Sequence, residues 1–439
     1  MLDLSAPLIV GFGVVGRAVA RALVGRGHQP LVVEDRPSDD VRAVAADIGV
    51  ELWEAPSPEE LAERMTTYSV LLPSPGVPDH HPCFAAAERA SVPVASEFDL
   101  ARRWDDRPLV AITGTNGKTT VTMMVTDILE RAGRSVAAVG NTEVPLVEAI
   151  DDPTIELFVV EASSFRLGHS QCFSPRVATW LNFAPDHLDA HASLEHYRRA
   201  KAAIWTNLGP DAVAIANADD DTVMTLAPAG SLRFGMGADA DWTVDNGVLR
   251  GPGGPLLPVA ELARRQPHDV ANALAAAATA TAAGAPSEAV AEGLRQFRGL
   301  PHRLELVGEW DGVQWYNDSK ATVPQATEAA VAGFESVVLI AGGRNKGLAL
   351  DGLRATVPPV RAVVAIGDAT DEVTDVFADL VTVTAARSME DAVTQAGQAA
   401  RSGDVVLLSP GCTSYDWYPN YVERGLDFRR LVESEVAGP

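Results

Sequence analysis

The sequence predicts an α/β protein of three consecutive domains, each built on a parallel sheet that is covered by helices. The length of 439 residues corresponds to three domains of about 150 residues each. Short apolar runs alternate with helical patterns, and this alternation is typical of parallel sheets with helices on both faces. Two glycine-rich turns, Gly11–Gly16 and Gly114–Gly117, each follow a predicted strand and precede a predicted helix. We therefore predict domains at residues 1–105, 106–299 and 300–439.

The first domain is predicted from short apolar runs that surround one clear helical pattern. A polar stretch, Trp104–Pro108, predicts a hinge at the end of this domain. The predicted elements are the strands Leu8–Val10, Leu31–Val33, Val70–Leu72 and Val92–Val94 and the helix Arg17–Arg26.

The second and third domains continue the alternation of strands and helices. In the second domain the predicted strands are Leu109–Ile112, Leu157–Glu161 and Val177–Leu181, and the helices are Thr119–Ala132, Leu194–Trp205 and Asp269–Ala283. The third domain begins near Gly299–His302, and its predicted strands are Val313–Tyr316, Val337–Ala341, Val363–Ile366 and Val405–Leu408.

The composition argues against several classes of partner. A net charge of −24 disfavours nucleic acid and anionic membranes, since both require a basic face on the protein. The three cysteines lie far apart and indicate neither a disulfide framework nor a cysteine zinc site. No apolar run reaches the about 18 residues of a membrane span. We expect a cytoplasmic, monomeric protein without membrane insertion.

The four lysines of the chain lie in loop-like or polar segments that suggest chemistry. They are accompanied by 31 arginines, the 35 basic residues less four, so the chain uses Arg wherever it needs only positive charge. Lysine differs from Arg because it is a compact point charge whose amine can lose its proton and be modified. The four positions are Lys118, Lys201, Lys320 and Lys346. A genome that disfavours lysine codons would explain the low count but not these locations.

The second glycine turn predicts a phosphate loop that binds ATP. Its residues Gly114-Thr-Asn-Gly117-Lys118-Thr119 lie between a strand and a helix, where backbone N–H groups and the helix N-terminus attract phosphate. Lys118 would reach the β and γ phosphates, and the Thr119 hydroxyl would bind Mg²⁺. The loop has two residues between its glycines, where the general pattern has four.

The first glycine turn allows two interpretations. Gly11-Phe-Gly13-Val-Val-Gly16 opens a helix, and the acidic pair Glu34-Asp35 follows about twenty residues later. By itself this pattern is a dinucleotide-binding fingerprint and would indicate an NAD-linked oxidoreductase. A single fingerprint of this kind is weak, and it does not account for the ATP loop that follows.

The shortened loop Thr-Gly-Thr-Asn-Gly-Lys-Thr-Thr resembles that of the Mur ligases, ATP-dependent amide-forming enzymes of peptidoglycan synthesis. Further matching motifs extend from Gly11 to Phe428. The resemblance implies a Rossmann-like N-terminal domain that binds a UDP-sugar, a P-loop ATPase-like central domain, and a Rossmann-like C-terminal domain that binds the amino acid. Folylpolyglutamate synthases share the loop, but the UDP-type first domain argues against that branch.

The resemblance assigns a catalytic group of four residues: Lys118, His187, Lys201 and Lys320. It places Mg²⁺ on Thr119, Glu161, His187 and Lys201, the last as a carbamate formed with CO₂. Glu161 ends one predicted strand and His187 follows another, at the sheet edge where ligand crevices form in open α/β folds. Only a deprotonatable amine can form a carbamate, so Lys rather than Arg at position 201 makes chemical sense.

The resemblance also assigns the three substrate sites. For ATP it implies Gly114, Thr115, Asn116, Gly117, Lys118, Thr119, Thr120, Asn272, Arg303 and Asp318. For the UDP-sugar it implies Gly13, Val14, Val15, Asp35, Arg36, Ser74, Gly76, Asn141 and Ser163. For the incoming glutamate it implies Thr322, Lys346, Ser414, Tyr415 and Tyr421. The chain departs from the usual motifs at Thr142, Arg166, Asp269, Val323 and Pro324.

The implied reaction joins D-glutamate to UDP-N-acetylmuramoyl-L-alanine through an acyl phosphate. The alternatives are the same chemistry with L-glutamate or another Mur-type substrate, a catalytically silent binding protein, and the NAD-linked oxidoreductase. The segment Asp-Asn-Pro-Arg, which would indicate diaminopimelate or lysine as the amino acid, does not occur in the sequence.

Overall fold

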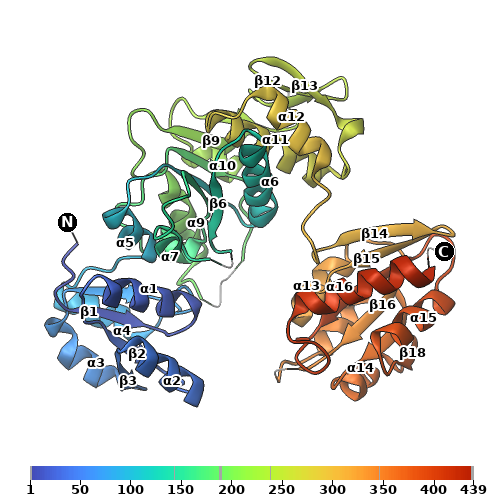
Figure 1. Ribbon diagram of the computed structural model, residues 1–439, viewed down its shortest axis with the longest axis horizontal. Helices are drawn as coiled ribbons and strands as arrows, with labels where there is room; N and C mark the ends of the chain where they lie inside the picture. The colour runs from blue at the N-terminus through green and yellow to red at the C-terminus, as the bar shows by residue number, and fades with distance from the viewer. Residues whose placement is uncertain (1, 143, 187–189, 238, 346, 437–439) are drawn as a thin grey trace. The chain divides into compact units, whose positions relative to one another are not determined.

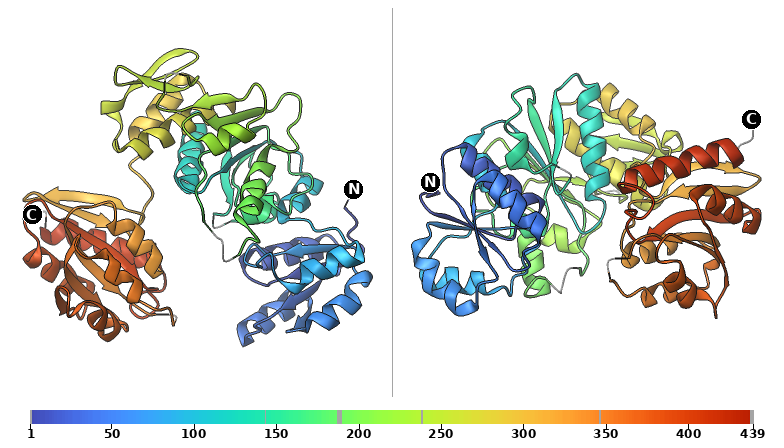
Figure 2. Two further views of the ribbon diagram at one scale, coloured as in Figure 1. Left: turned by 180° about the vertical axis from the view of Figure 1, so that it is seen from behind. Right: turned by 60° about the horizontal axis from the view of Figure 1, so that its bottom comes forward.

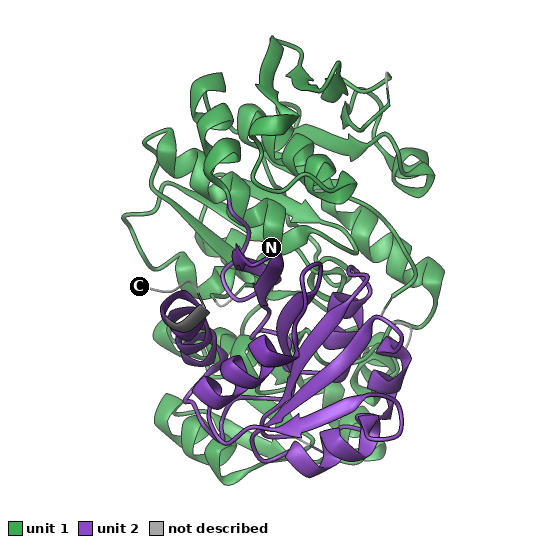
Figure 3. Cartoon of the chain, turned by 90° about the vertical axis from the view of Figure 1, so that its right-hand side faces the viewer, with its two compact units in different colours: residues 1–297 green, residues 298–439 purple. Residues whose placement is uncertain are grey.

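The computed structural model describes residues 2–142, 144–186, 190–237, 239–345 and 347–436. The chain forms two compact units, Met1–Phe297 and Arg298–Pro439, which Figure 3 distinguishes by colour. Figure 1 follows the elements along the chain. No helix in the described ranges combines the length and the apolar character that crossing a membrane would need.

The first sheet of unit 1 has four parallel strands in the order β3-β2-β1-β4. Its strands are β1 (Pro7–Val10), β2 (Leu31–Glu34), β3 (Glu51–Glu54) and β4 (Val70–Pro73), and its helices are α1 (Val14–Gly25), α2 (Asp39–Ile48), α3 (Pro58–Arg64), α4 (Pro82–Ala90) and α5 (Glu97–Trp104). The predicted strand at Val92–Val94 is wrong, since Val94 forms only an isolated bridge with Leu71. Pro93 interrupts this segment because proline cannot donate to a ladder.

The second sheet of unit 1 has six parallel strands in the order β10-β9-β8-β5-β7-β6. Its strands are β5 (Leu109–Thr113), β6 (Val136–Gly140), β7 (Leu157–Glu161), β8 (Val177–Trp180), β9 (Val213–Asn217) and β10 (Leu232–Phe234). The helices around it are α6 (Lys118–Arg131), α7 (Leu146–Ala149), α8 (Ser164–Leu167), α9 (Leu194–Ala202), α10 (Asp221–Leu226), α11 (Pro267–Ala282) and α12 (Ser287–Gln296).

Alternating side chains of β5 explain how both faces of the second sheet are covered. Val110 and Ile112 pack into a cluster with α6, α11 and α12, which lie together on one face (Figure 2). Leu109 and Ala111 point the other way, into a cluster that also contains Ile9 of the first sheet. Because successive strand residues face opposite sides of the sheet, the apolar run of β5 contributes side chains to two hydrophobic cores. One of these cores also contains residues of the first sheet.

A small antiparallel sheet corrects the expectation of parallel sheets only. It consists of β11 (Thr243–Asp245), β12 (Val248–Gly251) and β13 (Gly254–Pro258). Asn246 and Gly247, with φ of 50° and 74°, form the two-residue turn between β11 and β12. Asn-Gly is a strong local signal for such a hairpin, so this feature was readable in the sequence.

Unit 2 contains one six-stranded sheet in the order β14-β15-β19-β16-β17-β18. The strands are β14 (Glu305–Trp310), β15 (Val313–Asn317), β16 (Val337–Gly342), β17 (Val360–Ile366), β18 (Thr382–Ala385) and β19 (Val405–Gly411). Only the pairing of β14 with β15 is antiparallel among these described strands. Helices α15 (Met389–Ala399) and α16 (Tyr421–Leu431) cover one face, and α13 (Pro324–Val331) and α14 (Thr370–Phe377) cover the other. The predicted α/β class is confirmed.

Candidate active site

The predicted phosphate loop lies between β5 and α6, as the sequence indicated. Gly117 has a φ of +81°, and a Cβ atom there would lie 2.5 Å from Oδ1 of Asn272. Glycine is therefore required both by the backbone conformation and by the approach of Asn272. Asn272, the predicted adenine contact, lies on α11, and its side-chain amide is thus beside the phosphate loop.

Asn182 braces the loop from the end of β8. Its Oδ1 accepts hydrogen bonds from the backbone N–H groups of Thr115 (3.0 Å) and Asn116 (2.9 Å). Its Nδ2 donates to the carbonyl of Asn116 at 3.1 Å. One amide side chain thus fixes the shortened loop, and the sequence motifs gave no indication of this role.

Two of the four lysines meet at one backbone oxygen. Lys118 Nζ donates to the Gly114 carbonyl at 2.9 Å, and Lys201 Nζ donates to the same oxygen at 2.6 Å. Lys118 also donates to the Thr115 carbonyl at 2.9 Å. The structure therefore brings together two predicted catalytic residues from α6 and α9.

Lys201 is almost fully buried, with 1% of its surface exposed. Burial, and next the positive charge of Lys118, lower the pKa of Lys201 from 10.5 to about 6. Its Nζ lies 4.6 Å from the centre of the Tyr197 ring. A neutral amine at physiological pH is the form that can react with CO₂, so the environment suits the predicted carbamate.

Glu161 at the end of β7 offers an oxygen suited to a metal. The side chain is 2% exposed, and Oε1 accepts a hydrogen bond from Asn141 Nδ2 at 2.9 Å. Within the described ranges, its buried Oε2 has no hydrogen-bond partner. An orphaned carboxylate oxygen is costly unless a cation or donor meets it, and Mg²⁺ prefers such oxygens. The predicted ligand His187 lies outside the described residues.

Arg166 links the Glu161 region to a buried ion pair. Its Nη1 donates to Asn141 Oδ1 at 3.0 Å, and its Nε lies 3.0 Å from Glu97 Oε1. Arg166 and Glu97 are 4% and 2% exposed. Burial raises the pKa of Glu97, although Arg166 acts in the opposite direction. Arg166, which departs from the usual family motif, therefore places a positive charge beside the Asn141–Glu161 pair, and Glu97 neutralises that charge.

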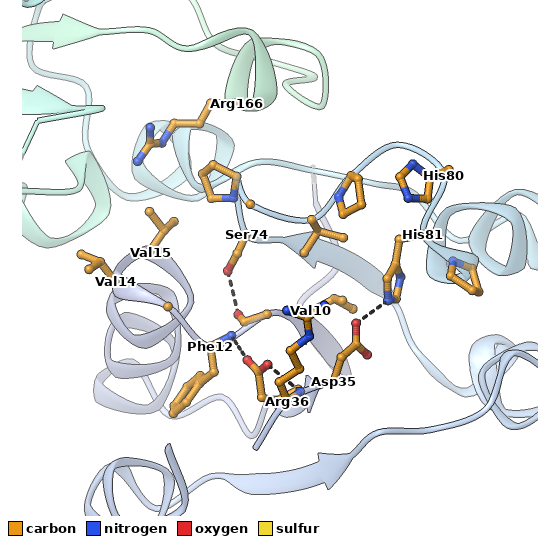
Figure 4. A pocket seen from close by; sticks show the side chains of 18 of the residues that line it. Val10, Phe12, Val14, Val15, Asp35, Arg36, Ser74, His80, His81 and Arg166 are labelled. Carbon is orange, nitrogen blue, oxygen red and sulfur yellow. Dashed lines mark hydrogen bonds and ion pairs between the residues drawn. The ribbon is translucent and has the colours of Figure 1, made fainter. Parts of the chain in front are cut away.

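A pocket of about 700 Å³ opens at the first glycine turn and is shown in Figure 4. Arg166 lies across it from Asp35 and Arg36. Eight of the predicted UDP-sugar residues line it: Gly13, Val14, Val15, Asp35, Arg36, Ser74, Gly76 and Asn141. Ser163 is not in the lining, and its hydroxyl instead caps α8. The predictions omitted the lining residues His80, His81 and Arg166, although the His-His pair after Ser-Pro-Gly was a visible signal.

Glu34 weakens the dinucleotide interpretation of this turn. Its Oε2 accepts from the Phe12 N–H at 2.8 Å and its Oε1 from the Arg36 N–H at 3.1 Å. Both oxygens of the carboxylate at the end of β2 are therefore used by the backbone, whereas a dinucleotide site uses such a carboxylate for ribose. The sheet also has four strands, fewer than the six of the dinucleotide fold.

Among the described residues of unit 2, the predicted Asp318 and Lys320 follow the carboxyl end of β15, and Ser414 follows that of β19. Asp318 follows β15 and accepts from Ser409 Oγ at 2.8 Å and from the Leu304 N–H at 3.1 Å. Burial raises the pKa of Asp318 to about 6. Lys320 places its Nζ 5.5 Å from the centre of the Tyr421 ring. The Ala321 carbonyl accepts from the Gly411 N–H at 2.9 Å, so the Thr322 segment adjoins the end of β19.

The predicted glutamate loops are also neighbours. Arg344 and Thr413 exchange two backbone hydrogen bonds of 2.8 and 3.1 Å, which brings the segment before position 346 against the Ser414 segment. Ser414 is buried and Tyr415 is exposed. Lys346 itself lies outside the described residues. Arg303, on the segment before β14, is exposed.

Comparison with known proteins identifies the family. The Mur ligase middle domain matches residues 112–280, and the Mur ligase glutamate ligase domain matches residues 302–412. A relative from Frankia casuarinae, named UDP-N-acetylmuramoylalanine–D-glutamate ligase, is 41% identical over 97% of this chain and 93% of its own length. A relative of the same name from Salinibacter ruber is 40% identical over 97% of both chains. The chain belongs to the Mur ligase family.

Solved structures share the Mur ligase fold at low sequence identity. UDP-N-acetylmuramate-alanine ligase from Thermotoga maritima has a TM-score of 0.53 at 19% identity, covering 97% of this chain and 98% of its own. MurF from Acinetobacter baumannii has a TM-score of 0.54 at 18% identity, covering 97% and 90%. These neighbours agree with the multidomain α/β architecture.

Arg424 is a structural residue of this Mur ligase that the motifs did not reveal. It is 1% exposed, and burial lowers its pKa to about 10. Its guanidinium donates to Ser319 Oγ (2.9 Å), the Ser319 carbonyl (2.8 Å) and the Cys412 carbonyl (3.1 Å from each of two nitrogens). Arg424 therefore joins the segment of Lys320 to the segment of Ser414.

Replacing Arg424 with Lys is expected to raise the KM for the amino acid and to lower the free energy of unfolding by about 1–3 kcal/mol. A lysine cannot reproduce the planar fork, and buried acceptors left without donors cost about this much each. Substrate titration and denaturant unfolding would measure the two effects. Arg430→Lys is the control, since Arg430 is 65% exposed. An unchanged KM and an unchanged free energy of unfolding in Arg424→Lys would contradict the proposed structural role of Arg424.

Replacing Gly16 with Ala is expected to raise the KM for the UDP-sugar about 10-fold. The new Cβ would lie 2.1 Å from the Gly11 carbonyl oxygen, which forces the glycine turn to move at a cost of about 1–3 kcal/mol. Gly25→Ala in the same helix is a matched control, because no atom lies within 4 Å of its Cβ position. Equal KM values for the two variants would show that the turn does not shape this site.

Proposed function

We propose that this Mur ligase is an ATP-dependent ligase that joins D-glutamate to UDP-N-acetylmuramoyl-L-alanine in the cytoplasm, acting as a monomer. The substrate assignment follows the name of relatives that are 41% and 40% identical over 97% of the chain. The single structural observation that supports the chemistry is the meeting of Lys118 and Lys201 at the Gly114 carbonyl. This arrangement places a cation and a modifiable amine together at the phosphate loop.

The first half of the reaction activates a carboxylate. The alanine carboxylate attacks the γ-phosphorus of ATP, a P–O bond forms, and the bond to ADP breaks, which yields an acyl phosphate. Lys118 neutralises charge that would otherwise repel the anionic nucleophile. The residues proposed to hold ATP beside it are the loop Gly114–Thr120, Asn272, Arg303 and Asp318.

Mg²⁺ fits the site because Glu161 offers a buried, unpartnered oxygen among the described residues. When bound there, Mg²⁺ would neutralise phosphate charge and polarise the reacting oxygens. Thr119, Glu161, His187 and carbamylated Lys201 would hold it. Carbamylation would form a bond between the neutral Lys201 amine and CO₂ and release one proton, which converts a neutral group into an anion.

The second half of the reaction forms the amide. The amine of glutamate attacks the activated carbonyl carbon, a C–N bond forms, and the C–O bond to phosphate breaks with loss of the amine proton. His187 is proposed to help remove that proton. Lys320 would stabilise the reacting centre, and the amino acid would be held by Thr322, Lys346, Ser414, Tyr415 and Tyr421. The pocket of about 700 Å³ in unit 1 would hold the UDP-sugar.

Phosphate release would test this function. The protein is supplied with ATP, Mg²⁺ and UDP-N-acetylmuramoyl-L-alanine, together with D-glutamate, L-glutamate or no amino acid. We expect release with D-glutamate only. Release with L-glutamate only would keep the mechanism and change the product. No release from folded protein with either amino acid would refute the proposal.

A further inference from the structure

A cluster of three imidazoles around one carboxylate lies beside the pocket in unit 1. It consists of Asp79, His169, His191 and His196, hereafter the Asp79 cluster. Asp79 belongs to the segment between β4 and α4, His169 follows α8, and His196 lies in α9. The chain has only nine histidines, so a third of them gather at this one carboxylate.

The polar atoms of the cluster have the spacing of a metal site. Asp79 Oδ2 lies 3.1 Å from His191 Nδ1 and 2.6 Å from His196 Nδ1, and Asp79 Oδ1 lies 4.0 Å from His169 Nε2. One ligand atom each of Asp79, His191 and His196 falls within 4.8 Å of the others. A tetrahedral ion at about 2.0–2.2 Å from its ligands separates them by roughly 3.3–3.6 Å, so small side-chain rotations would admit one.

The surrounding residues hold these rings in place. His191 stacks on Phe165 at 4.8 Å, and His169 stacks on Phe84 at 4.8 Å. His191 Nε2 lies 2.9 Å from Ser164 Oγ. When Nε2 donates its proton to that hydroxyl, Nδ1 is left with a lone pair directed at Asp79. Fixing one ring nitrogen by a hydrogen bond so that the other can bind is how proteins orient metal-ligating histidines.

The charge around Asp79 favours a cation at this position. The carboxylate is only 8% exposed, and its Oδ2 also accepts from the Ala192 N–H at 3.0 Å. An ionised, buried carboxylate facing two imidazole nitrogens needs either a proton or a metal ion in each of these contacts. His196 is 43% exposed and leaves a route by which an ion could enter.

We propose that the Asp79 cluster binds a divalent transition metal of the zinc class, separate from the Mg²⁺ of the ligase reaction. Two imidazoles and one carboxylate, with the His169 ring nearby, suit zinc and its neighbours, whereas Mg²⁺ requires oxygen ligands. The ion ties the Asp79 segment, whose neighbours Pro78 and His80 line the pocket, to α9, which carries Lys201. It therefore fixes the pocket wall against the helix of the catalytic lysine.

The test is metal binding by the full chain in excess Mg²⁺. Metal-stripped protein is titrated with Co²⁺ and Zn²⁺, and binding is followed by the visible spectrum of Co²⁺ and by calorimetry. We expect one site per chain, an intense tetrahedral Co²⁺ band that Zn²⁺ abolishes, and a higher melting temperature with Zn²⁺. Absence of a Zn²⁺ site in excess Mg²⁺ would overturn the proposal and leave a hydrogen-bonded network only.

Variants locate the site independently of ligase activity. His196→Ala and Asp79→Asn are expected to abolish the Co²⁺ band, and Ser164→Ala is expected to weaken Zn²⁺ binding about 10-fold. His268→Ala is the matched control, because His268 is 68% exposed and lies on α11. Melting of the metal-free variants shows that they fold. A Co²⁺ band that survives in folded His196→Ala and Asp79→Asn would place the ion elsewhere and refute the assignment.

Discussion

Replacing Lys118 with Ala is expected to lower kcat about 10²–10³-fold while the protein stays folded. The Lys118 ammonium is fixed by the carbonyls of Gly114 and Thr115 at 2.9 Å each, so it is positioned before ATP arrives. Removing one preorganised group that stabilises transition-state charge has an effect of this size. Phosphate release at saturating substrates measures the loss, and circular dichroism checks the fold.

The control for Lys118 is a cation of the same helix. Arg131 ends α6 and pairs with Asp127 at 2.7 Å on the surface. The variant Arg131→Ala therefore removes one positive charge from the same helix, but far from the phosphate loop. We expect its kcat to remain within about threefold of the unaltered protein, since exposed pairs contribute about 0–1 kcal/mol. A Lys118→Ala variant with similar activity would show that the loop does not carry the phosphate chemistry.

Replacing Lys201 with Met is expected to have two separate effects. The first is a loss of about 10²-fold in kcat, because the variant lacks the amine that we propose forms a carbamate and thereby supports Mg²⁺ and the transition state. The second is a changed dependence of stability on pH in CO₂-free buffer. Both can be measured on one protein, by phosphate release and by denaturant unfolding.

The sign of the pH effect follows from the pKa of Lys201, which is lowered from 10.5 to about 6. Between these values the unfolded lysine holds a proton that the folded lysine has lost, so the free energy of unfolding rises with pH. The slope is at most about 1.4 kcal/mol per pH unit. Below pH 6 Lys201 is protonated in both the folded and the unfolded state. The folded protein then bears the full free-energy cost of burying the charged amine. Lys201→Met should therefore stabilise the protein most at low pH.

Two observations would check the Lys201 prediction. A carbamate signal in carbon NMR with labelled bicarbonate should appear in the unaltered protein and be absent from Lys201→Met. Arg199→Met provides a matched control, because Arg199 lies on the same helix with 75% of its side chain exposed. If Lys201→Met and Arg199→Met gave the same pH slope, Lys201 would have an ordinary pKa.

Buried strands were predictable because their apolar runs are short and continuous. β7 was predicted with its observed bounds, and β1, β2, β5 and β8 within one residue at each end. The buried strand β9 (Val213–Asn217) was nevertheless missed, and other omitted strands have a different character. In half-exposed strands such as β3 (Glu-Leu-Trp-Glu) and β14, apolar and polar residues alternate too irregularly for the sequence to predict a strand. Helix α9 gives way to a 3₁₀ turn at Ala203–Trp205, where the sequence pattern continues as if helical.

The candidate site was predictable where a motif fixes local geometry and not where contacts join distant segments. The phosphate loop follows from glycines placed between a strand and a helix, and most of the predicted pocket lining follows from the resemblance to the Mur ligases. Asn182, Arg166 and Arg424 act through partners 66, 25 and 105 residues away. Hydrogen bonds of such sequence separation leave no periodic signal, so only the folded chain reveals them.

The shared Gly114 carbonyl has a consequence for the order of events during turnover. The charge of Lys118 contributes to the lowered pKa of Lys201, so an anionic nucleotide that screens Lys118 should raise that pKa. While the Lys201 amine is unmodified, ATP binding should therefore be coupled to proton uptake. The coupling is reciprocal, so acidification that protonates Lys201 should strengthen nucleotide binding by the same factor. Reaction with CO₂ requires the neutral amine, so carbamylation should proceed fastest before the nucleotide binds. Bicarbonate supplied ahead of ATP should shorten any lag in product formation.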